Sequence, residues 1–94
     1  MNTYPELVEE TVQMIQWMDG LMKSDEDPLI VAGFVARSYR ESLSSLQAAL
    51  ANDPENVDLR AGLAAILAAY PAALSFAERV QAEALAEAQR AVKH

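Results

Sequence analysis

Two Asp-Pro steps divide a chain of 94 residues that is otherwise rich in alanine and leucine. The first step is Asp27-Pro28 and the second is Asp53-Pro54. The aspartate of such a step can cap a helix, and the proline suits a first helical turn because its missing N–H is not needed there. Proline also disfavours a helical conformation at the residue before it. We therefore expect each step to end one helix and to begin the next. At the second step Asp53 is the expected cap, and Asn56 is a competing cap three residues later.

Between these steps, apolar side chains recur at intervals of three and four residues, which is typical of amphipathic helices. No stretch shows the alternation that would predict a strand. The expected helices span about residues 4–23, 28–51, 54–70 and 72–92. Pro71 either kinks one long helix or separates the last two, and the pattern leaves both alternatives open. The predicted fold is all-α, a small three- or four-helix antiparallel bundle with short Asp-Pro turns, forming a single domain over residues 1–94.

Each expected helix has one apolar stripe that predicts its buried face. The stripe of the first helix consists of Tyr4, Leu7, Val8, Thr11, Met14, Ile15, Met18, Leu21 and Met22. The stripe of the second consists of Val31, Val35, Tyr39, Leu43, Leu46, Ala49 and Leu50. The stripe of the third consists of Leu59, Leu63, Ile66, Leu67 and Tyr70. The last segment has a thinner stripe of Leu74, Ala77, Leu85, Ala88 and Val92, which Gln81 interrupts and which Phe76 and Val80 flank.

Five further residues refine these expectations. Thr3, followed by glutamate three residues later, predicts a capping box at the start of the first helix. Ile30 and Phe34 add apolar surface outside the stripe of the second helix, which predicts that its first half is buried on most sides. Gly33 and Gly62 lie inside helices, where glycine costs about 0.8–1 kcal/mol relative to alanine. Either close packing requires these glycines or the helices are locally soft.

The net charge of −7 is concentrated at the start of the chain. Residues 1–28 contain seven acidic residues and one lysine, a net charge of −6, and the remaining residues carry −1. Negative charge repels phosphates, so we expect no direct binding to nucleic acid. The same charge favours a partner protein with a basic surface, although acidic helices also serve solubility alone.

Several absences limit the environment and the chemistry. The chain has no cysteine, which excludes disulfides and thiolate metal sites. We find no run of about 18 apolar residues and expect no membrane-spanning segment. The start of the chain is acidic, unlike a signal peptide, and predicts a cytoplasmic protein.

No set of catalytic groups converges in the sequence. The single histidine is His94, and Ser44-Ser45 has no base at a useful spacing. Asp25-Glu26-Asp27 lacks the spacing of a calcium-binding loop. We therefore expect no catalytic residue, no bound metal and no cofactor, and predict that the chain is not an enzyme.

Residues 39–63 resemble the second helix, the turn and the start of the next helix in a tetratricopeptide repeat. The matching positions are Tyr39, Ala49, Leu50, Asp53-Pro54, Asn56 and Leu63. The resemblance covers about a quarter of the chain, with Ser42 in place of the usual alanine and Gly33 in place of an aromatic residue. About three repeats are needed to bury a continuous core, and this chain has part of one. The resemblance would imply an adaptor or chaperone that binds peptides.

The candidate partner-binding residues lie in the first helix. Trp17 projects about 120° from the centre of the apolar stripe, so another element covers it or it is free to anchor a partner. Methionine recurs every four residues on the apolar side, either as core or as an adaptable contact surface. The full candidate set is Trp17, Glu6, Glu9, Glu10, Gln13, Met14, Met18 and Met22.

These observations support two hypotheses for function. The first is a protein–protein interaction module, such as an adaptor, a small chaperone or an assembly factor, whose helix faces contact another protein or a second copy in a homodimer. The alternative is an acidic inhibitor that blocks a nucleic-acid-binding protein, as phage-encoded counter-defence (anti-CRISPR-like) proteins can.

Overall fold

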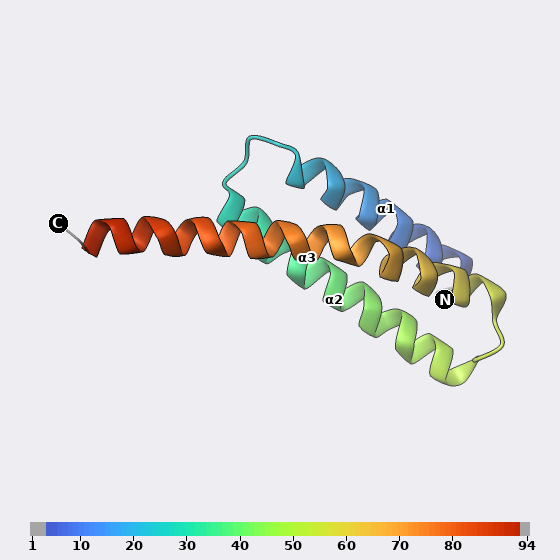
Figure 1. Ribbon diagram of the computed structural model, residues 1–94. Coiled ribbons are helices and arrows are strands. Elements are labelled where there is room, and N and C mark those ends of the chain that lie inside the picture. The colour runs from blue at the N-terminus through green and yellow to red at the C-terminus, as the bar shows by residue number, and fades with distance from the viewer. Residues whose placement is uncertain (1–3, 93–94) are drawn as a thin grey trace.

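The computed structural model describes residues 4–92 and contains three helices in this range (Figure 1). They are α1 (Tyr4–Met22), α2 (Pro28–Asn52) and α3 (Val57–Val92). No strand occurs within residues 4–92, so the all-α prediction is confirmed. The predicted capping box at Thr3 and the single histidine, His94, lie outside the described residues.

All three helices contact one another and share a core. The chain turns back at each of the two connections (Figure 1). The buried apolar residues are Met18, Val31, Val35, Tyr39, Leu46, Leu59, Ile66, Ala73, Phe76 and Val80. The stripes predicted for the first two helices are buried or partly buried along their whole length. The predicted and observed faces agree because the large apolar side chains of each helix recur on one face. That face packs against the other two helices.

The connection between α1 and α2 ends at an Asp-Pro step, where α2 begins. Pro28 is the first residue of α2, and the Asp27 carboxylate accepts a hydrogen bond from the backbone N–H of Leu29 at 3.0 Å. This bond satisfies one of the amide groups that have no partner inside the helix.

The connection between α2 and α3 differs from the prediction. We expected Asp53 to cap the next helix at about residue 54, but the backbone N–H of Asp53 bonds to Ala49 O and ends α2. Pro54 instead lies in a turn closed by a bond from Asn56 N to Asp53 O at 3.2 Å. The side-chain oxygen of Asn56 then accepts the N–H of Leu59 at 3.0 Å, so Asn56 caps α3. The cap is Asn56 because proline, with its fixed φ, also fits the second position of a tight turn.

α3 continues through Pro71 for 36 residues, so the structure has one long helix in place of helices at 54–70 and 72–92. Proline removes one backbone hydrogen bond from a helix interior. Core side chains on both sides of it, Ile66 before and Phe76 after, pack against the other helices and hold the axis continuous.

The predicted buried face of α3 is wrong from Leu67 onward. We expected Leu67, Tyr70 and Leu74 in the core, but they are 55%, 48% and 44% exposed. The core instead uses Phe76 and Val80, which the prediction placed at the edge of the stripe. The face of α3 that packs against α1 and α2 is therefore rotated about the helix axis away from its leucine-rich face.

The first half of α2 is also less buried than predicted. Ile30 and Phe34 are 70% and 46% exposed, although we expected other elements to cover them. Only one side of α2 faces the two neighbouring helices, and these residues lie outside that side.

By length and composition alone, α3 could cross a membrane, against the sequence expectation. Of its most apolar stretch of 18 residues, 28% is buried. A core helix of a water-soluble protein can have the same length and composition. The location of the protein stays a prediction.

Candidate interaction surface

α3 is longer than the helices that support it. It has 36 residues against 25 in α2, and at about 1.5 Å per residue its length is about 54 Å. Its C-terminal part projects beyond α1 and α2 (Figure 1). Residues 81–92 are all exposed except Ala84, which is half-buried. This overhang gives the molecule extents of 58 × 23 × 22 Å.

A stripe of residues that are apolar except for Gln81 runs along one side of α3 and onto the overhang. Two series with a spacing of seven residues form it. The first is Leu63, Tyr70, Ala77 and Ala84, and the second is Leu67, Leu74, Gln81 and Ala88. Leu85 and Val92 border the stripe on the overhang and are 60% and 85% exposed. A seven-residue apolar repeat over four heptads is the pattern of a helix that pairs with another helix. We call these ten residues the α3 stripe.

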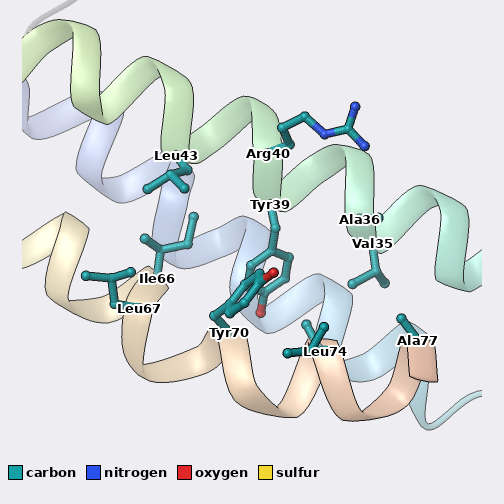
Figure 2. A pocket seen from close by; sticks show the side chains of 11 residues that line it. Val35, Ala36, Tyr39, Arg40, Leu43, Ile66, Leu67, Tyr70, Leu74 and Ala77 are labelled. Carbon is teal, nitrogen blue, oxygen red and sulfur yellow. The ribbon is translucent and has the colours of Figure 1, made fainter. Parts of the chain in front are cut away.

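The first half of the α3 stripe forms one wall of a groove between α2 and α3. The groove has a volume of about 340 Å³. Val35, Tyr39 and Leu43 line it from α2, and Leu67, Tyr70 and Leu74 line it from α3 (Figure 2). Its walls are thus aliphatic and aromatic, and they suit an apolar side chain.

Polar groups are few around this groove. Arg40 is a lining residue, but its guanidinium is directed away from the groove (Figure 2). Burial raises the pKa of the Tyr39 phenol above its ordinary value of 10.0, and the negative charge of Asp19 raises it further. The phenol is therefore neutral at physiological pH, and the groove offers contact surface without a charged group inside it.

The two ion pairs found within residues 4–92 lie away from the groove. Lys23 Nζ is 2.9 Å from Asp19 Oδ2, and Arg60 Nη2 is 3.6 Å from Glu55 Oε1. All four side chains are more than half exposed, so each pair contributes about 0–1 kcal/mol to stability. The acidic residues of α1 form no ion pair with the arginines of α2 in the described structure.

The structure divides the residues predicted to bind a partner. Met18 is in the core at 2% exposure, and Met14 and Met22 are half-buried against it. Trp17 is 70% exposed, so no element of the same chain covers it. The outer side of α1 also exposes Glu6, Glu9, Glu10 and Gln13. The methionines thus belong to the core, and the acidic residues with Trp17 form an exposed surface.

Sequence reasoning assigned the residues of the α3 stripe, except Gln81 and Ala84, to the core and did not list the stripe as a binding surface. The signal was the length of the repeat, which continues to Val92 although the helices predicted beside it are shorter. No group of three or more histidine, cysteine or carboxylate side chains within residues 4–92 is arranged to hold a metal ion.

No protein-family model matches the chain, and comparisons with curated proteins and with solved structures found no similar protein. The fold also departs from the tetratricopeptide resemblance, because α3 alone is longer than a whole repeat of that family, which contains two helices. Function is therefore inferred from the surface itself.

Proposed function

We propose that this antiparallel bundle is a protein–protein interaction module, such as an adaptor, a small chaperone or an assembly factor, that binds through apolar helix faces. The observation that carries the proposal is the α3 stripe with its groove. Leu67, Tyr70 and Leu74 lie in successive turns of one helix face, and each is 44–55% exposed. Contiguous apolar surface of this kind marks interaction sites, whereas single exposed apolar residues need no explanation.

Capture of bound proteins by variants of this surface tests the proposal. Leu67→Gln together with Leu74→Gln removes apolar area that the core does not use, so the chain should still fold. Val57→Gln is the matched control, because Val57 is 77% exposed at the first residue of α3 and outside the stripe. We expect the wild type and the control to capture the same protein after cross-linking in host cells, and the double variant to lose it. Equal capture by all three chains would contradict the proposal.

The second candidate is an acidic inhibitor of a nucleic-acid-binding protein. One observation favours it: Glu6, Glu9 and Glu10 are all exposed on the outer side of α1, close in sequence to the exposed Trp17. Carboxylates with an aromatic residue between them can occupy a basic site that normally binds phosphates.

Salt dependence separates the two candidates. If α1 binds a basic surface, the affinity should fall steeply with salt, and Glu6→Lys, Glu9→Lys and Glu10→Lys together should abolish binding. Glu83→Lys with Glu87→Lys on the α3 overhang is the control for a general change in charge, and it should weaken binding much less. Binding to the same protein that does not respond to salt would exclude the inhibitor.

A further inference from the structure

We infer that the occupant of the α3 stripe is a second copy of this chain, bound in an antiparallel pair in which the α3 overhang of each copy lies in the α2–α3 groove of the other. The inference rests on the proposed function and names its partner. Four observations carry it: the exposed area, the distribution of charge, the order of large and small residues, and the shape of the groove.

The exposed area is larger than a compact monomer of this mass should have. A folded monomer of 10.2 kDa exposes about 5,300 Å², whereas this chain exposes 6687 Å². The excess is about 1,400 Å² per chain, and a standard interface removes about 800 Å² from each partner. The radius of gyration is 16.3 Å against about 12 Å for a compact chain of this length. One interface of standard size along the overhang would remove somewhat more than half of this excess.

The charge distribution favours a second copy over a basic partner on this face. α2 has two arginines and one glutamate, and α3 has three arginines and four acidic residues. The two helices together are therefore neutral, although the whole chain carries −7. The seven acidic residues and the one lysine that give residues 1–28 a net charge of −6 lie in α1 and the loop after it. Two copies can thus meet through α2 and α3 without bringing like charges together.

The order of side-chain sizes along the stripe makes it complementary to itself when reversed. Its first half has the large residues Leu63, Leu67, Tyr70 and Leu74. Its second half has three alanines, Ala77, Ala84 and Ala88, among the larger Gln81, Leu85 and Val92. A two-fold axis near Ala77 places the half with only large residues in one copy on the half that contains the alanines in the other. A parallel pair would instead place large residues on large ones and leave the alanine half loosely packed.

The antiparallel register also fills the groove. The residues that face one another across the axis are Leu63 with Val92, Leu67 with Ala88, Tyr70 with Leu85, and Leu74 with Gln81. The partner's Leu85 thereby lies against Tyr70, at the wall of the apolar groove of about 340 Å³. Because Leu85 is 60% exposed and outside the core of its own chain, its side chain is free to enter that groove.

Mass measurement at several concentrations tests the pairing. The wild type should have a mass near twice 10.2 kDa by light scattering, and Leu85→Glu should raise the dissociation constant by roughly 10–100-fold. Ile30→Glu is the control: Ile30 is 70% exposed on α2 and is not a lining residue of the groove. It should leave the dimer intact. Because neither position is in the core, circular dichroism should show that both variants fold.

Single cysteines test the register, because the chain has none of its own. Ala77→Cys lies near the axis and should form a disulfide-linked dimer under mild oxidation. Leu85→Cys should not, because position 85 faces position 70 of the other copy, and the rise of the helix then separates the two cysteines by roughly 20 Å. A parallel pair would cross-link at both positions and would overturn the antiparallel inference.

Two outcomes separate this inference from the function on which it rests. A wild type that stays at 10.2 kDa at all concentrations, while the stripe variants lose a captured host protein, overturns self-pairing and leaves the interaction module standing. A monomer that floats with phosphatidylcholine vesicles, and whose Leu85→Glu variant does not, overturns both proposals and assigns the stripe to lipid.

Discussion

Gly62 and Gly33 both lie inside helices, but their surroundings differ. A Cβ at Gly62 would be 3.2 Å from Leu46 Cδ2 and 3.3 Å from Val8 Cγ2, at the point where all three helices meet. A Cβ at Gly33 would meet no atom within 4 Å. A side chain at the first position would therefore press on its neighbours, and the second glycine is a local weakness of α2.

Alanine at these two positions should have opposite effects. Gly33→Ala should raise the free energy of unfolding by about 0.5–1 kcal/mol, because alanine favours the helix and nothing blocks its methyl group. Gly62→Ala gains the same propensity but forces buried neighbours to move, which costs about 1–3 kcal/mol. Urea unfolding of both variants measures the difference. Equal stabilisation would show that the helices at Gly62 can separate without cost.

The buried phenol of Tyr39 makes the free energy of unfolding depend on pH in the alkaline range. Its pKa in the folded chain is above 10.0 because of burial and the nearby charge of Asp19. The neutral Tyr39 phenol therefore makes its full contribution to the free energy of unfolding below pH 10. That contribution is lost as the pH rises from 10 through the pKa of Tyr39 in the folded chain, because in this range the phenol ionises readily only in the unfolded chain. Urea unfolding between pH 8 and pH 11 should show a steeper loss above pH 10 for the wild type than for Tyr39→Phe. Parallel curves would contradict the assignment.

At single residues, the sequence predicted which side of α1 and α2 is buried, and did not predict what covers the remaining sides. Met18 and Leu46 are in the core because periodicity places them at the centre of their stripes. Trp17 could not be assigned, since its position off the stripe is compatible with both burial and exposure. That choice depends on where the other helices lie, which is tertiary information.

Among the elements, the start of α3 depends on Asn56 and not on the Asp-Pro step before it. The Asn56 side chain accepts the N–H of Leu59 and donates its own amide to Asp53 Oδ2 at 3.1 Å. Asn56→Ala should lower the free energy of unfolding by about 1 kcal/mol. Asn52→Ala is the control: Asn52 is exposed in the last turn of α2, with a bond of 3.5 Å to Ala48 O. If urea unfolding shows a larger loss of free energy of unfolding for Asn52→Ala than for Asn56→Ala, Asn56 is not the cap of α3.

Element boundaries were the less predictable part of the sequence for a physical reason. Asp53 and Asn56 both can cap a helix, and Pro54 fits both a first helical turn and a tight turn. Local chemistry leaves the two starts similar in energy, so packing selects one. The same holds for Pro71, because the lost hydrogen bond is a local cost and the burial of Ile66 and Phe76 on either side is a gain that only the tertiary structure shows.

For the whole molecule, the sequence predicted the helical content better than the shape. Each apolar stripe predicts that one helix face is buried, and the all-α class follows directly from the helical spacing of the stripes. The α3 overhang did not follow, because the prediction assumed that every apolar stripe is covered within the chain. Residues 81–92 break this assumption: their stripe is regular, but α2 has too few residues to reach them.

The length of α3 also decides the shape of a single copy in solution. A straight α3 gives a radius of gyration near 16.3 Å, whereas a chain that bends at Pro71 and folds its last turns back onto the core would approach the compact value of about 12 Å. Small-angle X-ray scattering separates these values. The measurement should use Leu85→Glu, because this change removes an apolar contact between copies while Leu85 is outside the core. We expect the value of the straight helix, 16.3 Å. The compact value would instead show that the overhang folds onto its own groove, and then the apolar face would be satisfied within one chain and would need no second copy.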